Sequence, residues 1–217
     1  MNYDSVPLRD FKELNDWETV IFVYQSALKQ VETKIDILNG EFQHRHKYNP
    51  IEHVKSRIKT PESIVKKLKR HGYESSIENM VRYVNDIAGI RISCSFTSDI
   101  YLIADMISKQ NDLTILARRD YMKNPKKSGY RSYHMLVTTP VFLSDSIIDT
   151  KVEIQIRTVA QDFWATLEHK MHYKFEGDGP DYITKELREC ARYVAELDTR
   201  MDCLLYTSPS PRDRSVS

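Results

Sequence analysis

The sequence predicts an α+β domain, in which a mixed β-sheet of four to five strands is flanked by helices, with helical extensions at both ends. Apolar residues recur at three- and four-residue steps over 17–38 and again over 182–201, which is the period of an amphipathic helix. Between these segments, apolar and polar residues alternate over 90–96 and over 151–157, which is typical of half-buried strands. The 217 residues contain no internal repeat, so we expect one domain with a single core.

Two helices are expected before the first strand. The first covers 17–38, and the second begins at Pro61. Thr60 suits the capping position, proline fits the first helical position, and Glu62 adds a negative charge to the positive first turn. Gly72 is expected to end this helix.

Strands and helices follow one another in the rest of the chain. The predicted order is strand 90–96, helix 99–110, strand 114–118, loop 125–129, strand 130–139, strand 151–157, helix 159–173 and helix 182–201. In the strand at 151–157 the apolar residues alternate with polar ones that share the opposite face, namely Glu153, Gln155 and Arg157.

The chain is expected to divide into three parts. Residues 1–16 form an N-terminal extension, and residues 17–202 form the folded domain with its flanking helices. From Cys203 the helical pattern gives way to the Ser-, Pro- and Arg-rich stretch 203–217, which resembles translated read-through of a sequencing adapter. We expect this tail to be non-native or disordered.

Charge is balanced overall but clustered locally. The formal net charge is +1, yet seven Lys or Arg lie within 55–70 and six lie within 118–131, each run with a single acidic residue. Two basic runs in a neutral protein indicate a bound polyanion. The alternative is a solvated helix and loop surface.

The three cysteines indicate a reducing compartment. Cys94, Cys190 and Cys203 have neither paired nor metal-ligand spacing, so they are expected to be free thiols of a cytoplasmic protein. No apolar stretch is long enough to span a bilayer, so no membrane partner is expected.

Acidic and basic side chains occur together near two strands. Asp86 precedes the strand that carries Arg91, and Glu153 shares a strand face with Gln155 and Arg157. Phosphoryl and pyrophosphoryl transfer need a metal held by carboxylates and cations for the phosphate oxygens. Three polar side chains on one face also indicate a cleft, because buried polar groups need partners. A solvated outer sheet face is the alternative.

A second cluster follows the loop at 125–129. Tyr130 can stack on a base, and His134 can donate a hydrogen bond to a phosphate. A packed core tyrosine and a structural histidine are the alternatives. No Walker loop, GxGxxG, HExxH or nucleophile elbow is present, and Cys94 lies on the apolar side of its strand.

Four segments resemble, in order and spacing, the synthetase motifs of the RelA/SpoT-type alarmone synthetases. They are DIAGIR at 86–91, GYRSYH at 129–134, EIQIRT at 153–158 and FWATLEH at 163–169. The resemblance runs from about residue 24 to 193 and covers neither a hydrolase domain nor regulatory domains. It therefore implies a small alarmone synthetase, and residues 24–38, 49–53 and Asp162 are closer to the RelP branch than to RelQ.

This resemblance implies a nucleotidyltransferase-like fold, a homotetramer formed through the terminal helices, and an activity. The implied reaction transfers the β,γ-pyrophosphate of ATP to the 3′-hydroxyl of GDP or GTP, giving ppGpp or pppGpp in the stringent response. Asp86 and Glu153 would hold Mg²⁺, and Glu153 would help to deprotonate the attacking hydroxyl. A single-stranded RNA regulator is a further partner that the resemblance allows.

The resemblance also divides the basic residues between two nucleotides. The ATP contacts would be Arg57, Arg91, Lys59, Lys67 and Arg70. For the guanine nucleotide, Tyr130 would stack on the base, Gln155 would complete the pocket, and the phosphate contacts would be Arg119, Lys126 and His134.

Two other functions stay open from the sequence. One is a toxin-like relative that transfers pyrophosphate to tRNA or to adenosine nucleotides, and the pocket around Tyr130, Gln155 and Asp162 would decide the acceptor. The other is a non-catalytic protein that binds nucleotides or RNA. The presence of both Asp86 and Glu153 favours an enzyme, because a binding module needs no pair of metal carboxylates.

Overall fold

A computed structural model of the chain describes residues 16–46, 48–175 and 180–207. Its centre is a five-stranded mixed sheet in the order β1-β2-β5-β4-β3. Strands β2 and β5 are parallel and the other neighbours are antiparallel. The strands are β1 (Ile51–Ile58), β2 (Ala88–Cys94), β3 (Thr114–Asp120), β4 (Tyr133–Phe142) and β5 (Ile147–Thr158). The predicted α+β class and strand number are confirmed.

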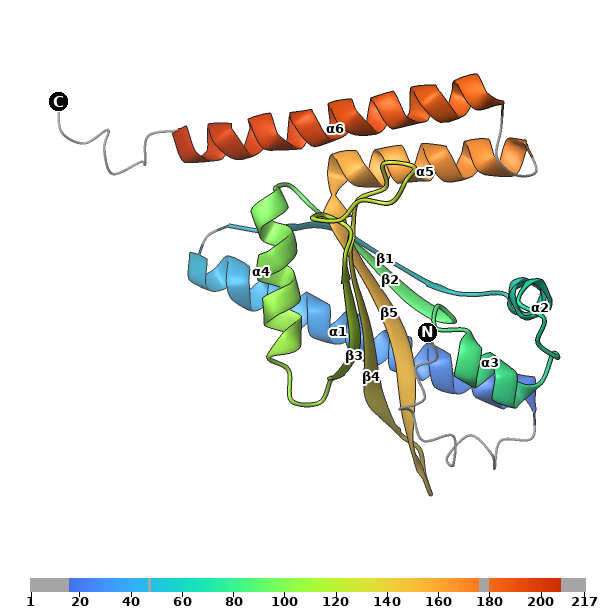
Figure 1. The fold of residues 1–217 in the computed structure, drawn as a ribbon. Helices are drawn as coiled ribbons and strands as arrows, with labels where there is room; N and C mark the ends of the chain where they lie inside the picture. Colours follow the sequence, from blue (N-terminus) through green and yellow to red (C-terminus); the bar gives the residue numbers. More distant parts are fainter. Residues whose placement is uncertain (1–15, 47, 176–179, 208–217) are drawn as a thin grey trace.

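Within the described residues, six helices accompany the sheet (Figure 1). They are α1 (Trp17–His46), α2 (Pro61–Arg70), α3 (Ile77–Tyr83), α4 (Thr97–Ser108), α5 (Val159–Lys174) and α6 (Asp181–Thr207). Helix α1 lies across the sheet and contacts β1, β2, β4 and β5, and α4 packs on β2, β4 and β5. Helices α5 and α6 lie side by side at one end of the molecule (Figure 1). None of the helices in the described ranges combines the length and apolar character that a membrane crossing requires.

The core lies between α1, α4 and one face of the sheet. Helix α1 buries one apolar stripe, which includes Val20, Tyr24 and Val31. Strands β2 and β5 supply alternating apolar side chains, of which Ile90, Ile92, Ile154 and Ile156 are almost fully buried. Because side chains alternate along a strand, the polar residues of β2 and β5 are directed to the other face of the sheet.

The predicted start of α2 is confirmed. The Thr60 side chain accepts a hydrogen bond from the Ser63 amide at 3.3 Å, and Pro61 is the first helical residue. Gly72 follows the helix with φ of 77°, a left-handed conformation that glycine adopts without steric cost.

Several predicted boundaries were wrong. Helix α1 continues eight residues beyond the predicted end at 38, and neither β1 nor α3 was predicted as an element. Tyr130 lies in the loop before β4, which begins at Tyr133. Helix α6 ends at Thr207, whereas the predicted helix ended at 201; the division of the chain into three parts stays a prediction. The remainder of the expected tail, and the N-terminal extension apart from Asp16, lie outside the described residues.

Candidate active site

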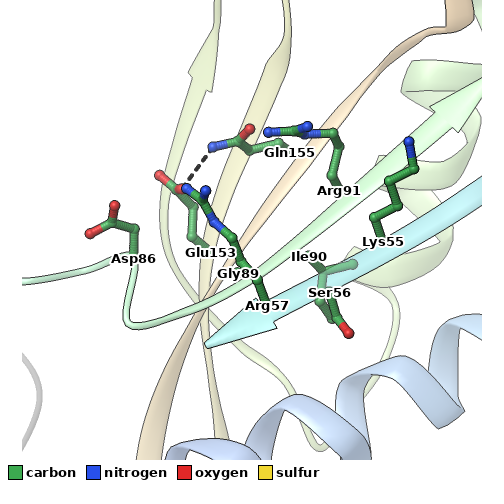
Figure 2. A pocket seen from close by; sticks show the side chains of 9 residues that line it. All are labelled: Lys55, Ser56, Arg57, Asp86, Gly89, Ile90, Arg91, Glu153 and Gln155. Atoms are coloured by element: carbon green, nitrogen blue, oxygen red, sulfur yellow. Dashed lines mark hydrogen bonds between the residues drawn. The ribbon is translucent and has the colours of Figure 1, made fainter. Parts of the chain in front are cut away.

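The polar face of β5 carries a ladder of hydrogen bonds. Arg157 Nη2 donates to Gln155 Oε1 at 2.8 Å. Gln155 Nε2 donates in turn to Glu153 Oε2 at 2.8 Å (Figure 2). Arg157 is only 2% exposed, so this face is not the solvated outer surface that alternation alone allowed. The three side chains therefore belong to a structured polar site.

Asp86 lies in the turn between α3 and β2 and is held by two lysines. Lys59 Nζ donates to its Oδ2 and Lys67 Nζ donates to its Oδ1, each at 2.7 Å. Burial alone would raise the pKa of Asp86, but the hydrogen bonds and charges of the two ammonium groups lower it to about 2. Asp86 is therefore ionised at neutral pH.

Glu153 is also held in its charged form. Burial and the charge of Asp86 both raise the pKa of this carboxyl, yet its interactions with His134 and Gln155 leave the pKa below its ordinary value. His134 Nδ1 lies 3.7 Å from Glu153 Oε1, and His134 Nε2 lies 2.9 Å from the Tyr130 hydroxyl. A chain of contacts thus joins the carboxylate to the tyrosine.

Two cavities meet at these carboxylates. The β1 cavity lies along β1, β2 and β5, and the residues that line it are Lys55, Ser56, Arg57, Asp86, Gly89, Ile90, Arg91, Glu153 and Gln155 (Figure 2). The β4 cavity is lined by Lys67, Asn85, Asp86, Ala117, Arg119, His134, Met135, Leu136 and Glu153. Asp86 and Glu153 line both cavities, and each cavity has its own cations.

The register of the strands explains this arrangement. Gly89 of β2 pairs with Glu153 of β5, and Arg57 of β1 pairs with Gly89. The absence of a side chain at Gly89 leaves space between the arginine and the carboxylate, and nothing lies within 4 Å of where its Cβ would be. On the other side of β5, His134 of β4 pairs with Gln155.

Residues 56–178 match a family model described as a region found in RelA / SpoT proteins. The chain belongs to the RelA/SpoT family. Two relatives from Bacillus subtilis (strain 168) are GTP pyrophosphokinase YwaC, 46% identical over 87% of this chain and 90% of the relative, and GTP pyrophosphokinase YjbM, 35% identical over 85% and 86%.

Solved structures of the family have the same fold. Small alarmone synthetase 2 from Bacillus subtilis superposes with a TM-score of 0.81 at 44% identity, covering 88% of this chain and 99% of that one. Small alarmone synthetase 1 from the same organism, solved with its product pppGpp, has a TM-score of 0.83 at 32% identity, covering 89% and 98%. The fold expected from the RelA/SpoT resemblance is therefore confirmed.

Most residues that the RelA/SpoT resemblance assigned to ATP lie near the β1 cavity, with two exceptions. Arg57 and Arg91 line that cavity, and Lys59 reaches Asp86 beside it. Lys67 instead lines the β4 cavity, while Arg70 is exposed at the end of α2 and lines neither.

The residues that the RelA/SpoT resemblance assigned to the guanine nucleotide are also divided. Arg119 and His134 line the β4 cavity, whereas Gln155 lines the β1 cavity. Lys126 lies in the loop after β3, and its Nζ is 4.6 Å from the centroid of the Tyr130 ring. These positions bring both groups to one face of the sheet.

The ring of Tyr130, which was expected to stack on a base, is not fully exposed. It is half-buried and packs against the small cluster Trp164, Ala165 and Ala191 between α5 and α6. The guanidinium carbon of Arg157 lies 5.5 Å from the centroid of this ring. Two cationic groups, those of Lys126 and Arg157, therefore lie close to the ring.

Asp162, in the first turn of α5, forms a further part of the site. Its carboxylate lies 3.5 Å from Arg91, 3.7 Å from Arg157 and 3.9 Å from Lys55. From the sequence, Asp162 was assigned to the acceptor pocket and to the RelP-like pattern, and Lys55 was assigned no individual role at the site. Their signal was present, because Lys55 begins the first basic run and Asp162 directly precedes the FWATLEH motif.

Proposed function

We propose that the chain is a GTP pyrophosphokinase that moves the β,γ-pyrophosphate of ATP onto the 3′-hydroxyl of GDP or GTP, making ppGpp or pppGpp. The observation that carries this is the pair of cation-lined cavities that meet at Asp86 and Glu153. A transfer between two nucleotides needs two anion sites and one shared reaction centre. The names of the family relatives, both GTP pyrophosphokinases, support the same reaction.

ATP binds in the β1 cavity and the guanine nucleotide in the β4 cavity. Arg57 and Arg91 neutralise the phosphates of ATP, while Arg119 and His134 contact the phosphates of the acceptor. Tyr130 stacks on the guanine base, with Lys126 beside it. The ammonium groups of Lys59 and Lys67 lie against Asp86, where both cavities meet. There they can contact the phosphates that are transferred.

The carboxylates fit a magnesium ion. Asp86 and Glu153 supply the oxygen ligands that Mg²⁺ prefers, and Mg²⁺ commonly takes only one or two carboxylates together with substrate phosphates and waters. A magnesium ion held there would neutralise charge on the phosphates. Asp86 would supply oxygens to the ion, and Lys59 and Lys67, whose ammonium groups contact Asp86, would lie beside the phosphates. Glu153 accepts the proton of the attacking 3′-hydroxyl, because the contacts with His134 and Gln155 keep it ionised.

The assembly we propose is a homotetramer formed through the terminal helices. Helix α6 carries exposed Tyr193, Leu197 and Leu204, which are 56%, 49% and 60% exposed in the single chain. A row of apolar side chains on a surface helix is typical of an interface. Light scattering of the purified chain is expected to give four times the monomer mass. The cytoplasmic location, the RNA regulator and the RelP branch stay predictions.

The reaction is tested by product identification. The chain is incubated with Mg²⁺, ATP and one acceptor at a time, namely GDP, GTP, ADP or tRNA, and the products are separated and weighed by mass spectrometry. We expect AMP to form in step with a guanine nucleotide that is heavier by one pyrophosphate. Transfer to tRNA or ADP alone would favour the toxin-like relative, and ATP turnover to ADP would exclude pyrophosphate transfer.

A further inference from the structure

Lys151 of β5 is a buried cation outside the roles assigned above. It lies two residues before Glu153 on the same face of the strand and is only 1% exposed. Its Nζ donates to Asn85 Oδ1 at 2.7 Å and to the Arg82 carbonyl at 3.3 Å. No ion pair joins Lys151 to a carboxylate among the residues that the structure describes.

Such a position costs stability. Removing an ammonium group from water is unfavourable, and two neutral oxygens compensate less than a carboxylate would. Burial, together with the charge of Lys67, accordingly lowers the pKa of Lys151 to about 8. A methionine of similar shape would fill the same space without this cost. Packing alone therefore does not explain why a lysine occupies this position.

The contact between Lys151 and Asn85 offers an explanation. An ammonium group only donates hydrogen bonds, so the atom of Asn85 that faces it must be the amide oxygen. The amide is thereby fixed in one orientation, with Nδ2 on the side away from Lys151. Asn85 itself lines the β4 cavity beside Lys67, Arg119 and His134, and it directly precedes Asp86.

We propose that Lys151 is a positioning residue that orients Asn85, and that Asn85 Nδ2 donates a hydrogen bond to a phosphate oxygen of the nucleotide in the β4 cavity. Asn85 is then a further acceptor-binding residue. The inference rests on the proposed function for the identity of that nucleotide, a guanosine di- or triphosphate. The β4 cavity is lined by the carboxylates Asp86 and Glu153 and by three basic groups, Lys67, Arg119 and His134, and these basic groups together with Asn85 Nδ2 would give a phosphate its donors.

The first test replaces Asn85 by aspartate. Asn85→Asp keeps an acceptor for Lys151 and turns that contact into an ion pair, so the melting temperature is expected to stay the same or rise. The new carboxylate removes the donor and repels phosphate, so the KM and Kd for GDP are expected to increase about tenfold or more while the KM for ATP changes less than about threefold. Asn111→Asp, in the exposed turn between α4 and β3, adds the same charge outside both cavities and serves as the matched control.

The second test replaces Lys151. Lys151→Met removes the ammonium and releases the Asn85 amide, so GDP binding is expected to weaken about threefold to tenfold. The melting temperature reports separately on the Arg82 carbonyl and Asn85 Oδ1, which both lose their donor. Lys151→Arg keeps a donor and is expected to recover part of the loss. Calorimetric titration of GDP into each variant provides a readout that does not depend on catalysis.

The outcomes separate this inference from the proposed function. Unchanged GDP binding in Asn85→Asp, or a large loss of melting temperature in Lys151→Met without weaker GDP binding, would overturn the inference and make the lysine structural. If instead the wild type binds GDP but transfers no pyrophosphate, the proposed function fails. The weaker binding of Asn85→Asp would then still support the inference.

Discussion

At the scale of single residues, the site depends on charges that are held in place before any ligand binds. Glu153 is fixed by Gln155 on one side and His134 on the other, and Asp86 is fixed by two lysines. Each carboxylate therefore stays ionised despite its burial. A preorganised site of this kind loses little free energy to reorientation when the reaction begins.

Tyr130 provides a residue-scale prediction. Replacing Tyr130 by alanine removes the ring against which a base would stack. The KM for GDP is expected to rise, by an amount that corresponds to a loss of about 1–3 kcal/mol in binding free energy. Tyr130→Phe keeps the ring but loses the contact to His134 Nε2, so most of the affinity is expected to remain. Kinetic titration of GDP at saturating ATP measures both variants.

Equal losses in the two tyrosine variants would contradict a stacking role and point to the hydroxyl. The ring also packs against Trp164 and Ala191, so the melting temperature of each variant must be recorded with the kinetics. A large decrease in melting temperature for Tyr130→Ala would assign the loss to packing.

The sequence predicted which residues share a strand face at the site, but it did not predict which distant residues contact them. Alternation along 151–157 placed Glu153, Gln155 and Arg157 on one face, and the structure confirms that shared face. It could not predict that Lys67 lines the β4 cavity, because α2 approaches the site only through the tertiary fold. The pair Lys151–Asn85 was missed for the same reason, since its members are far apart in the chain.

At the scale of elements, strong local signals were reliable and weak ones were not. The cap and proline at the start of α2 gave its first residue correctly. Strand β1 was missed because its sequence, IEHVKSRI, is mostly exposed and charged along an edge of the sheet. An edge strand of this kind derives its stability from pairing with β2, which is not visible in local sequence.

The loop before β4 provides an element-scale prediction. Gly129 has φ of 92°, and a Cβ there would lie 2.5 Å from Ala191 Cβ on α6. Gly129→Ala is therefore expected to destabilise the chain by about 1–3 kcal/mol and to weaken the use of GDP, because the loop carries Tyr130. Denaturant unfolding and GDP kinetics measure the two effects.

Gly40 offers a matched control for this substitution. It lies within α1 with nothing within 4 Å of its Cβ position, so Gly40→Ala is expected to stabilise the chain by about 0.5–1 kcal/mol. If Gly129→Ala had the same small effect as Gly40→Ala, the close approach of the loop to α6 would not constrain the site.

At the scale of the whole molecule, one face of the sheet carries two cavities that meet at Asp86 and Glu153. Strand β5 lies between β2 and β4, so its polar face is shared by both cavities. This arrangement predicts that damage to one cavity mainly affects one substrate. The two basic runs of the sequence reach this point from opposite sides, because β1 and β3 lie at opposite edges of the same sheet and β5 lies at its centre.

The division of the cavities is tested by substrate titration. Arg57→Ala and Arg91→Ala are expected to raise the KM for ATP about tenfold or more, with a smaller effect on GDP. His134→Ala and Lys126→Ala are expected to show the reverse preference. If both pairs impaired the two substrates equally, the cavities would not belong to separate nucleotides.

Glu153 allows the most direct test of the central claim. This claim is that pyrophosphate passes from ATP in the β1 cavity to a guanine nucleotide in the β4 cavity, at the carboxylates that line both. The measurement follows label from β-labelled ATP into GDP, with wild type and Glu153→Gln at equal concentration and with their melting temperatures recorded. The wild type is expected to place the label on the guanine nucleotide and to release AMP. Glu153→Gln is expected to do so at least about a hundredfold more slowly while still folding and binding GDP, because it loses the proton acceptor and a ligand oxygen charge. Label transfer by Glu153→Gln within a few-fold of wild type, or no labelled guanine nucleotide from the wild type, would contradict the account.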